Sequence, residues 1–516
     1  MDVLIDVGVA IDVLAQRSPF VEASTRALSK AASDHSRAWL YVGSVQTLSH
    51  VLKGQLQVSS EGGEDHETVA AERLDTFTKR FHWLAALTED AEGVFADDDP
   101  EAAQLSRAVA RLGPHAKLLT RNPALLSRCQ QAVSPEDFLE LECPPQPTAF
   151  IDLAAQQDRL RAGIERRTHA VLRHGKYILG PEVAELEAEL CAYTGTRECA
   201  TCASGTDALL MALMALEIGP GDAVFTTPFT FVATSEVIAL LGATPVYADI
   251  DPETFNLDPE RLAEAIAAIK AEGKLRPGAI MPVDLFGLAA NYGRIQEIAS
   301  EHELPVIQDA AQAFGAVAHG KTAPAHGTIG CTSFFPAKPL GAYGDGGACF
   351  TDDAELAERL RSIRVHGMGA DKYDTVRPGI NGRLDTLQAA ILLEKLAVYP
   401  AEVEARQRVA GQYCEAIGHL PDLRLPRIPP GYLSVYAQFT VRHPRRHELQ
   451  QALKAAGIPT AIYYPQPSHQ SSAYAGRTWY RALPEAERAS REVLSLPFGP
   501  DVKRELIERI RQAWMG

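Results

Sequence analysis

The chain has 516 residues, 46% of them hydrophobic and 22% charged, which is enough for two or three domains with substantial cores. Fifty Lys and Arg against 66 Asp and Glu give a net charge of −16. Without an overall positive field, nonspecific attraction to nucleic acid or to anionic membranes is not expected. The start of the chain lacks the features of a signal peptide, no apolar run approaches the length of a spanning helix, and eight scattered cysteines suit reduced thiols. A cytoplasmic protein without membrane contact is expected.

The first 140 residues alternate apolar runs with helical patterns. MDVLID predicts a strand that ends at Asp6, and a helical pattern follows to about residue 32. AWLYVGS and AKLLTRN predict two further strands. This alternation indicates a small parallel α/β domain over 1–142. The proline-rich segment ELECPPQPTA then predicts a linker over 143–150.

The same alternation continues on a larger scale over 151–399. ALLMALMALEIG predicts a helix that stops at Gly219, and PERLAEAIAAIKA predicts another. Between the helices lie the apolar runs AVFTTP, TPVYADI, AIMPVDLFG, LPVIQDAA and GACFTDD. They predict a doubly wound α/β sheet with ligands at the carboxyl ends of its strands. From 400 to 516, the pattern predicts a smaller α+β domain whose elements are AEVEARQRVAGQYCEAIG (helix), YAQFTVR (strand), ELQQALKAAG (helix) and KRELIERIRQAW (helix).

One close cysteine pair, Cys199 and Cys202 in ECATCASGT, resembles half of a zinc site. No second pair and no histidines follow at a matching spacing. Two small buried thiols on a strand are therefore expected, and no metal site is predicted.

Four short segments carry residues that could bind a ligand or take part in a reaction. Ser204-Gly205-Thr206 precedes a helix, so it is either a phosphate site or simply a helix N-cap. Asp309 ends an apolar strand, with Gln312 three residues later; this pair is either a ligand site or a capping aspartate with a solvated glutamine.

The other two segments hold an aromatic residue and a lysine. Phe231, near another strand end, is either core or a ring-stacking residue. Lys338 lies in SFFPAKPLGAYGDGG, among aromatic residues, prolines and glycines. A solvated surface lysine would not require such neighbours. A lysine for a Schiff base, an acid for a pyridine nitrogen, an aromatic for a ring face and a helix terminus for a phosphate are together what pyridoxal phosphate (PLP) requires.

Residues 148–516 resemble the DegT/StrS-type nucleotide-sugar aminotransferases, a fold-type-I PLP family. The resemblance rests on motifs that occur in family order: FIDLAAQQDRL, HGKYILGPEVAELEAEL, SGTDAL, GDAVFTTPFTFVAT, PVYADIDPETFNLDP, IQDAAQAFGA, SFFPAKPLGAYGDGGA, RVHGM, GINGRLDTLQAAIL and YYPQPSHQSSAY. It implies a large domain with a mixed sheet and a small C-terminal α+β domain.

The resemblance also implies roles for individual residues. Lys338 matches the Schiff-base lysine, Asp309 the carboxylate at the pyridine nitrogen, and Gln312 the residue near the ring hydroxyl. Phe231 matches the stacking aromatic. The phosphate binders are matched by Gly205, Thr206, Ser333 and, across a homodimer interface, Asn381. The sugar-nucleotide pocket of the family corresponds to His366, Arg383, Tyr464 and His469.

The activity implied is transfer of an amino group, most often from L-glutamate in this family, to a ketone on a UDP- or dTDP-linked sugar, in surface-polysaccharide or other amino-sugar biosynthesis. KPLGAYGDGG favours the members that act on 3-keto sugars over those that act on 4-keto sugars. Gly382, Leu288 and Ser471 depart from common family residues, which concerns sugar specificity and leaves the cofactor set intact. Relatives that act as dehydratases or regulators lack the lysine, whereas Lys338 is present.

The first 140 residues resemble a PIN-like nuclease domain, whose active members bind Mg²⁺ or Mn²⁺ through three or four acids. Asp6 is retained, but Gly8 replaces the usual asparagine and Gln46 occupies the region of the central acid. The remaining nearby acids do not match the paired acid of the family: Asp97, Asp98, Asp99 and Glu101. A noncatalytic domain is therefore expected, with a bifunctional protein carrying an active ribonuclease as the alternative.

Overall fold

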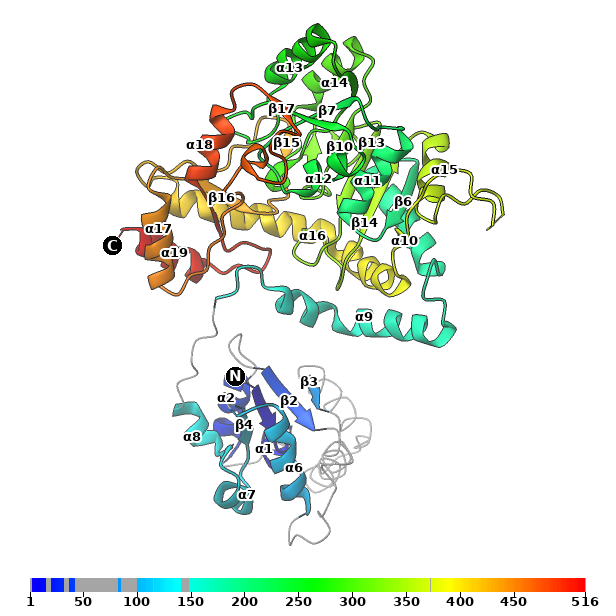
Figure 1. The fold of residues 1–516 in the computed structure, drawn as a ribbon. Coiled ribbons are helices and arrows are strands. Elements are labelled where there is room, and N and C mark those ends of the chain that lie inside the picture. Colours follow the sequence, from blue (N-terminus) through cyan, green and yellow to red (C-terminus); the bar gives the residue numbers. More distant parts are fainter. Residues whose placement is uncertain are drawn as a thin grey trace. The chain divides into compact units, whose positions relative to one another are not determined.

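The computed structural model describes residues 2–14, 20–31, 37–41, 82–84, 100–114, 116–140, 148–371 and 373–515. Contacts divide the chain into two compact units, Met1–Pro147 and Thr148–Gly516, and Figure 1 colours them along the sequence. The division lies within the predicted linker of 143–150. Each unit is described by itself.

The N-terminal unit contains a five-stranded sheet in the order β3-β2-β1-β4-β5, and its pairings are all parallel. The strands are β1 (Asp2–Ile5), β2 (Arg37–Tyr41), β3 (His82–Leu84), β4 (Lys117–Leu119) and β5 (Ala132–Val133). The helices are α1 (Val7–Leu14), α2 (Val21–Ala31), α6 (Pro100–Arg111), α7 (Pro123–Arg128) and α8 (Pro135–Glu140). The sheet confirms the predicted small parallel α/β arrangement, while the likeness to PIN domains stays a prediction.

The positions singled out for a nuclease site are only partly described. Asp6 follows β1, is buried, and accepts a hydrogen bond from the Thr120 hydroxyl. Gly8 lies in α1 and Glu101 in α6. Gln46, Asp97, Asp98 and Asp99 lie outside the described residues.

The larger unit is built on a mixed sheet. Its strands are β6 (Glu198–Cys202), β7 (Asp222–Thr226), β8 (Thr244–Tyr247), β9 (Arg276–Ile280), β10 (Ile307–Asp309), β13 (Ile329–Ser333), β14 (Gly347–Thr351) and β17 (Trp479–Tyr480). They form two segments ordered β10-β13-β14-β6 and β17-β8-β7-β9. Parallel bridges at Ile280–Val306 and Val283–Asp309 join β9 to β10. Only β14 pairs antiparallel to its neighbours among these described strands, which confirms the predicted mixed sheet.

Helices cover this sheet and form a second layer. They are α9 (Leu153–His174), α10 (Pro181–Thr194), α11 (Gly205–Ala215), α12 (Ala233–Leu240), α13 (Pro259–Glu272), α14 (Tyr292–Glu301) and α15 (Ala354–Ile363). α11 packs against β6, β13 and β14, and its inward side chains are fully buried or nearly so. Its small residues Ala208 and Ala212 allow this close approach. The N-terminus of α11 is thereby fixed at the ends of β6 and β13.

The long helix α16 (Thr386–Ile417) runs beneath the sheet domain in Figure 1 and contacts α9 and α10. It passes through Pro400, so the predicted helix that begins at 401 is the second half of a longer one. The predicted domain boundary at 399/400 thus falls within a continuous helix. Proline costs a helix interior one backbone hydrogen bond, and here the buried flanking side chains of Tyr399 and Val403 hold the helix together across that point.

The C-terminal part confirms the predicted α+β elements. The antiparallel pair β16 (Phe439–Arg442) and β18 (Val493–Leu496) lies with α17 (Arg446–Ala455), α18 (Pro484–Glu492) and α19 (Arg504–Met515). Tyr413 from α16, Phe439 and Phe498 stack at the centre of the core of this region. Within the described ranges, no helix has the length and apolar character needed to cross a membrane.

Candidate active site

The helix terminus predicted to bind phosphate lies against the end of β13. Ser204 caps α11, its hydroxyl accepting a hydrogen bond of 3.0 Å from the Asp207 amide. The cap interpretation is therefore correct, and it leaves the first turn of α11 available to an anion. A Cβ placed on Gly205 would lie 2.6 Å from the Cβ of Ser333. The structure thus brings the first turn of α11, which begins with Gly205 and Thr206, against Ser333 from a distant part of the sequence.

Asp309 ends β10 and is 4% exposed. One carboxylate oxygen accepts a hydrogen bond of 2.8 Å from the Thr234 hydroxyl, and the other accepts one of 3.2 Å from the Ala311 amide. Burial raises the pKa of Asp309, whereas these hydrogen bonds and the nearby Lys338 ammonium oppose the rise. Thr234, in α12, was missed by the sequence reasoning, although the hydroxyl that ends the TFVAT run is a signal that could have been used.

Lys338 interacts electrostatically with Asp309. Its side chain is half-buried, and its amide donates a hydrogen bond of 2.8 Å to the Phe335 carbonyl, which makes a tight turn. Burial lowers the pKa of the Lys338 ammonium, and the Asp309 carboxylate acts in the opposite direction. A lowered lysine pKa favours the neutral amine, which is the nucleophilic form. Lys338 is therefore no ordinary surface charge.

Gln312 and Tyr464 meet beside Asp309. The Gln312 amide donates a hydrogen bond of 2.9 Å to the Tyr464 hydroxyl, and its oxygen accepts one of 2.8 Å from the Phe286 amide. Gln312 is 5% exposed, so the solvated alternative is wrong. Phe231 is 54% exposed with its ring 6.4 Å from that of Tyr464, so it is not core. Its face remains open to a flat ligand.

A second buried carboxyl, Asp284, lies behind Asp309 and was not anticipated. Its amide donates a hydrogen bond of 2.9 Å to the Asp309 carbonyl. Its side chain is fully buried and accepts hydrogen bonds from the Gln308 amide (2.6 Å), the Ala290 amide (2.9 Å) and the Tyr292 hydroxyl (2.8 Å). Burial raises the pKa of Asp284 to about 7 in spite of these donors. The carboxyl holds together the segment that contains η3 (Leu285–Gly287).

The segment from His366 to Arg383 lies next to the end of β6. The His366 amide donates a hydrogen bond to the Ile380 carbonyl, and the Ala203 amide donates one to the Gly382 carbonyl. Both hydrogen bonds are 3.0 Å long. Asn381 and His366 are exposed, whereas the Nε of Arg383 is buried and has no hydrogen-bond partner among the described residues. These three side chains therefore lie on two hydrogen-bonded backbone stretches close to the N-terminus of α11.

His469 occupies a more enclosed position. It lies in η4 (Ser468–Gln470), is 8% exposed, and its Nε2 is 3.2 Å from a carboxylate oxygen of Glu487 in α18. The amide of Ser468 donates a hydrogen bond of 2.8 Å to the Pro228 carbonyl. This bond connects η4 to the segment that carries Phe231. The other ring nitrogen, Nδ1, is buried with no partner in the described part of the chain. The structure thus leaves His469 one unused hydrogen-bonding atom.

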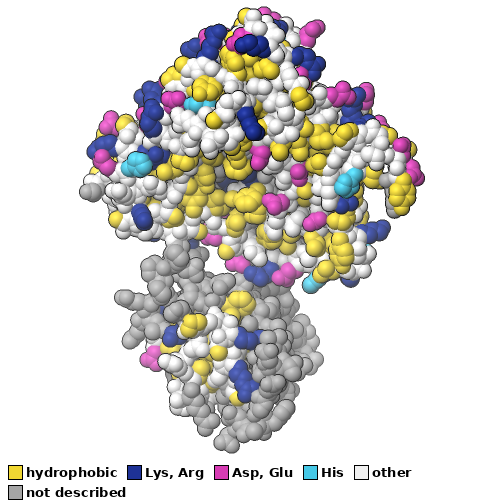
Figure 2. All heavy atoms as spheres, in the orientation of Figure 1, with side chains coloured by type: hydrophobic (Ala, Val, Ile, Leu, Met, Phe, Trp, Pro, Cys, Tyr) yellow, Lys and Arg dark blue, Asp and Glu magenta, His cyan; other side chains and the backbone are white. Residues whose placement is uncertain are grey.

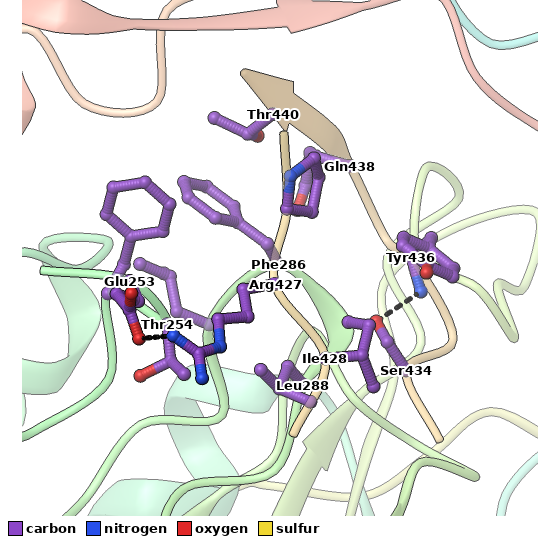
Figure 3. A pocket seen from close by; sticks show the side chains of 13 residues that line it. Glu253, Thr254, Phe286, Leu288, Arg427, Ile428, Ser434, Tyr436, Gln438 and Thr440 are labelled. Carbon is purple, nitrogen blue, oxygen red and sulfur yellow. Dashed lines mark hydrogen bonds and ion pairs between the residues drawn. The ribbon is translucent and has the colours of Figure 1, made fainter. Parts of the chain in front are cut away.

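Two pockets lie on the η3 side of the site and contain none of the predicted residues. Figure 3 shows the first, with Phe286, Leu288 and Ile428 around it and the Arg427–Glu253 ion pair beside it. Its cavity volume is 20 Å³, enough for about one water molecule. A neighbouring, more polar pocket of 380 Å³ shares Glu253 and Arg427.

The predicted pair of thiols is confirmed as structural. Cys199 and Cys202 are both buried in β6 and both free. Burial raises the pKa of each thiol well above its ordinary value, so both stay protonated and unreactive.

The residues around Lys338 fit pyridoxal phosphate. The N-terminus of α11, where glycine at 205 lets the backbone approach Ser333 closely, suits a phosphate at a helix terminus. Asp309 offers a buried carboxylate for a protonated ring nitrogen, and Lys338 offers an amine whose pKa is already lowered. These are the features of a PLP-dependent enzyme of fold type I.

The comparisons with known proteins establish the class. The DegT/DnrJ/EryC1/StrS aminotransferase family matches residues 158–514, so the chain belongs to this family. It is therefore a PLP-dependent aminotransferase with the predicted α/β architecture.

Individual relatives cover the larger unit. One, from Pseudomonas aeruginosa, is named UDP-2-acetamido-2-deoxy-3-oxo-D-glucuronate aminotransferase and is 50% identical over 68% of this chain and 95% of its own. Another, from Geobacillus stearothermophilus, is named pleiotropic regulatory protein and is 44% identical over 70% of this chain and 97% of its own.

Solved structures agree. A DegT DnrJ EryC1 StrS aminotransferase from Brucella abortus aligns with a TM-score of 0.70 at 48% identity, covering 72% of this chain and 99% of its own. A Bacillus subtilis structure described with bound cofactor PMP, the aminated form of PLP, aligns with a TM-score of 0.63 at 30% identity, covering 69% of this chain and 81% of its own.

Proposed function

We propose that the enzyme transfers an amino group from L-glutamate to the ketone of a UDP- or dTDP-linked 3-keto sugar, in the biosynthesis of an amino sugar for a surface polysaccharide. The observation that carries this proposal is the buried Asp309 carboxylate, held by Thr234 and the Ala311 amide, together with the close approach of the α11 N-terminus to Ser333. The 3-oxo sugar named for the Pseudomonas relative supports the keto position.

Each residue then has a distinct task. Lys338 would hold the cofactor through its amine, and the free amine would move a proton between the reacting carbon atoms. Asp309 keeps a proton on the ring nitrogen, and Thr234 holds the carboxylate in place. Gln312, held by the Phe286 amide and Tyr464, would bind the ring hydroxyl. PLP itself supplies the electron-accepting ring.

The remaining candidate residues bind the ends of the ligands. Phe231 covers the ring face, and the phosphate is bound at Gly205, Thr206 and Ser333. The sugar nucleotide is bound by residues around the opening: His366, Arg383, Tyr464 and His469. The unpartnered Arg383 Nε and His469 Nδ1 are atoms that such a polar ligand would satisfy.

A homodimer completes this site. Asn381 is exposed and is proposed to bind the phosphate of a second copy. Large apolar side chains are also exposed in this unit; they include Tyr177 (47%), Ile178 (46%) and Phe335 (51%). Figure 2 shows hydrophobic side chains gathered across the middle of one face of the larger unit. A second copy covering them would remove this apolar area from water.

The alternatives are weaker on specific grounds. A regulator without catalysis has no need of a lysine with a lowered pKa beside Asp309. For a ribonuclease, the described acid Asp6 is engaged by Thr120, and we propose that the N-terminal unit is noncatalytic. The described cysteines are all free, which supports the proposed cytoplasmic location.

The proposal is tested with a panel of UDP- and dTDP-linked 3-keto and 4-keto sugars, each with L-glutamate, analysed by mass spectrometry. We expect an amino-sugar product and 2-oxoglutarate with a 3-keto substrate, and neither with Lys338→Ala. Product from 4-keto sugars alone would refute the keto position, and no product from any sugar with cofactor-loaded enzyme would refute the substrate class.

A further inference from the structure

A lysine other than Lys338 is buried in this unit without an acidic partner. Lys395, in α16, is 2% exposed. Among the described residues it forms no ion pair, and the charged group that acts on its pKa is Glu402. Glu402 already receives hydrogen bonds from Gln156 (2.7 Å) and Arg159 (2.9 Å). Removing a cation from water costs several kcal/mol in a real protein. Other contacts of Lys395 must therefore offset this cost.

The compensating contacts of Lys395 are both made by the loop that carries Lys338. Its Nζ donates a hydrogen bond of 2.6 Å to the Gly341 carbonyl. The same Nζ lies 4.3 Å from the centre of the Tyr343 ring, a cation–π contact. Burial lowers the pKa of Lys395 to about 8. The side chain is therefore well accommodated only when residues 341–343 are in place.

A second side chain of α16 holds the same loop. Gln388 lies seven residues before Lys395, which is two helical turns, so the two side chains share one face of the helix. Its oxygen accepts a hydrogen bond of 2.9 Å from the Tyr343 amide. We call Gln388 and Lys395 the helix clamp. Together they fix the end of the loop at two points.

The loop itself is closed, so a constraint at its end reaches Lys338. The Ala342 amide donates a hydrogen bond of 2.7 Å to the Phe334 carbonyl. A Cβ on Gly341 would lie 2.5 Å from the Pro336 carbonyl oxygen, so the two arms touch. Lys338 is at the tip between these arms. A displacement of Gly341 therefore displaces the backbone from which the Lys338 amine extends.

We propose that Lys395 is a positioning residue for the reaction: it fixes the loop so that the released Lys338 amine stays within reach of the carbon whose proton it moves. This inference rests on the proposed role of Lys338. A misplacement of about 1 Å at a reacting group costs about 100-fold in rate. The effect should therefore fall on the proton-transfer step and not on substrate binding.

The test compares Lys395→Met, which keeps an unbranched side chain one atom shorter and removes the charge, with the wild-type holoenzyme. We expect kcat to fall by roughly 10- to 100-fold, with the KM for L-glutamate changed far less. The isotope effect on kcat with glutamate deuterated at Cα should rise, because proton transfer becomes more fully rate-limiting.

Two further variants separate positioning from stability. Val409→Ala, on the same helix but in the C-terminal core, lowers stability without touching the loop; its kcat and isotope effect should match wild type. Gln388→Met should show the Lys395→Met signature in weaker form and serves if Lys395→Met does not fold.

Several results would overturn the inference. They are wild-type kcat and isotope effect in folded Lys395→Met, the same changes in Val409→Ala at equal loss of Tm, or a wild-type isotope effect in Gln388→Met. Failure of the wild-type enzyme to bind its cofactor through Lys338 would instead refute the proposed function.

Discussion

Gly205→Ala tests whether the contact between α11 and β13 forms the phosphate site. The added Cβ would lie 2.6 Å from the Ser333 Cβ, 3.1 Å from its Oγ and 3.2 Å from its Cα. Ordinary carbon–carbon contacts are about 3.5–4.0 Å, so the backbone of one partner must move by about 1 Å. The strain should cost about 1–3 kcal/mol of stability.

The larger effect should be on cofactor binding. A shift of this size misaligns at least one hydrogen bond to the phosphate, and such charge-assisted bonds are worth about 1.5–3 kcal/mol. The Kd for PLP should therefore rise by roughly 10- to 100-fold. Titration of the apoprotein with PLP, followed by absorbance, measures this Kd, and thermal unfolding of the apoprotein measures the stability loss separately.

Gly219→Ala is the matched control. Gly219 lies shortly after the C-terminal end of α11, and an added Cβ there meets no atom within 4 Å. Its PLP affinity should equal that of wild type. Wild-type affinity in Gly205→Ala would show that the phosphate is bound elsewhere and would refute the reasoning.

Three further predictions concern titration and stability. Thr234→Val removes a hydrogen bond that lowers the pKa of Asp309, so that pKa should rise and the acidic limb of the pH profile of kcat/KM should move to higher pH; an unmoved limb would contradict the role of Thr234. The raised pKa of Asp284, about 7 in the folded chain against about 3.9 unfolded, means that the folded state holds the proton more tightly, so the free energy of unfolding should fall by up to about 4 kcal/mol as pH rises from about 4 to 7. Urea unfolding across this range should show a shallower fall for Asp284→Asn, and an equal slope would mean that Asp284 does not titrate there. Gly411→Ala, at an exposed position of α16 with no atom within 4 Å of the new Cβ, should raise the free energy of unfolding by about 0.5–1 kcal/mol, measured by Tm, and a lower Tm would contradict this.

The features that the sequence predicted well are those governed by local rules. Ser204 is a capping residue directly before an apolar helix, and Asp309 directly follows an apolar strand, so each position was predictable from its neighbours. The burial of Cys199 and Cys202 followed from their place in a strand with no metal-ligand spacing around them.

The features that were missed, or reached only through family resemblance, depend on contacts between distant segments. Tyr464 was placed near the site only by family resemblance, because its hydrogen bond to Gln312 joins residues 152 positions apart. Asp284 lies within the apolar run MPVDLFG. Nothing in that run indicates that three other residues donate hydrogen bonds to its carboxylate. Lys395 looks in sequence like a lysine on a helix surface, since its partners, Gly341 and Tyr343, belong to a loop more than 50 residues earlier.

The most direct test of the central claim is reduction of the PLP-loaded enzyme with borohydride, followed by peptide mass mapping. Reduction makes the bond between lysine and cofactor permanent. The account predicts that the cofactor mass is found on the peptide containing Lys338, and that Lys338→Ala carries none. Cofactor attached to Lys395, the buried lysine of α16, or to no lysine in the active wild-type enzyme would contradict it.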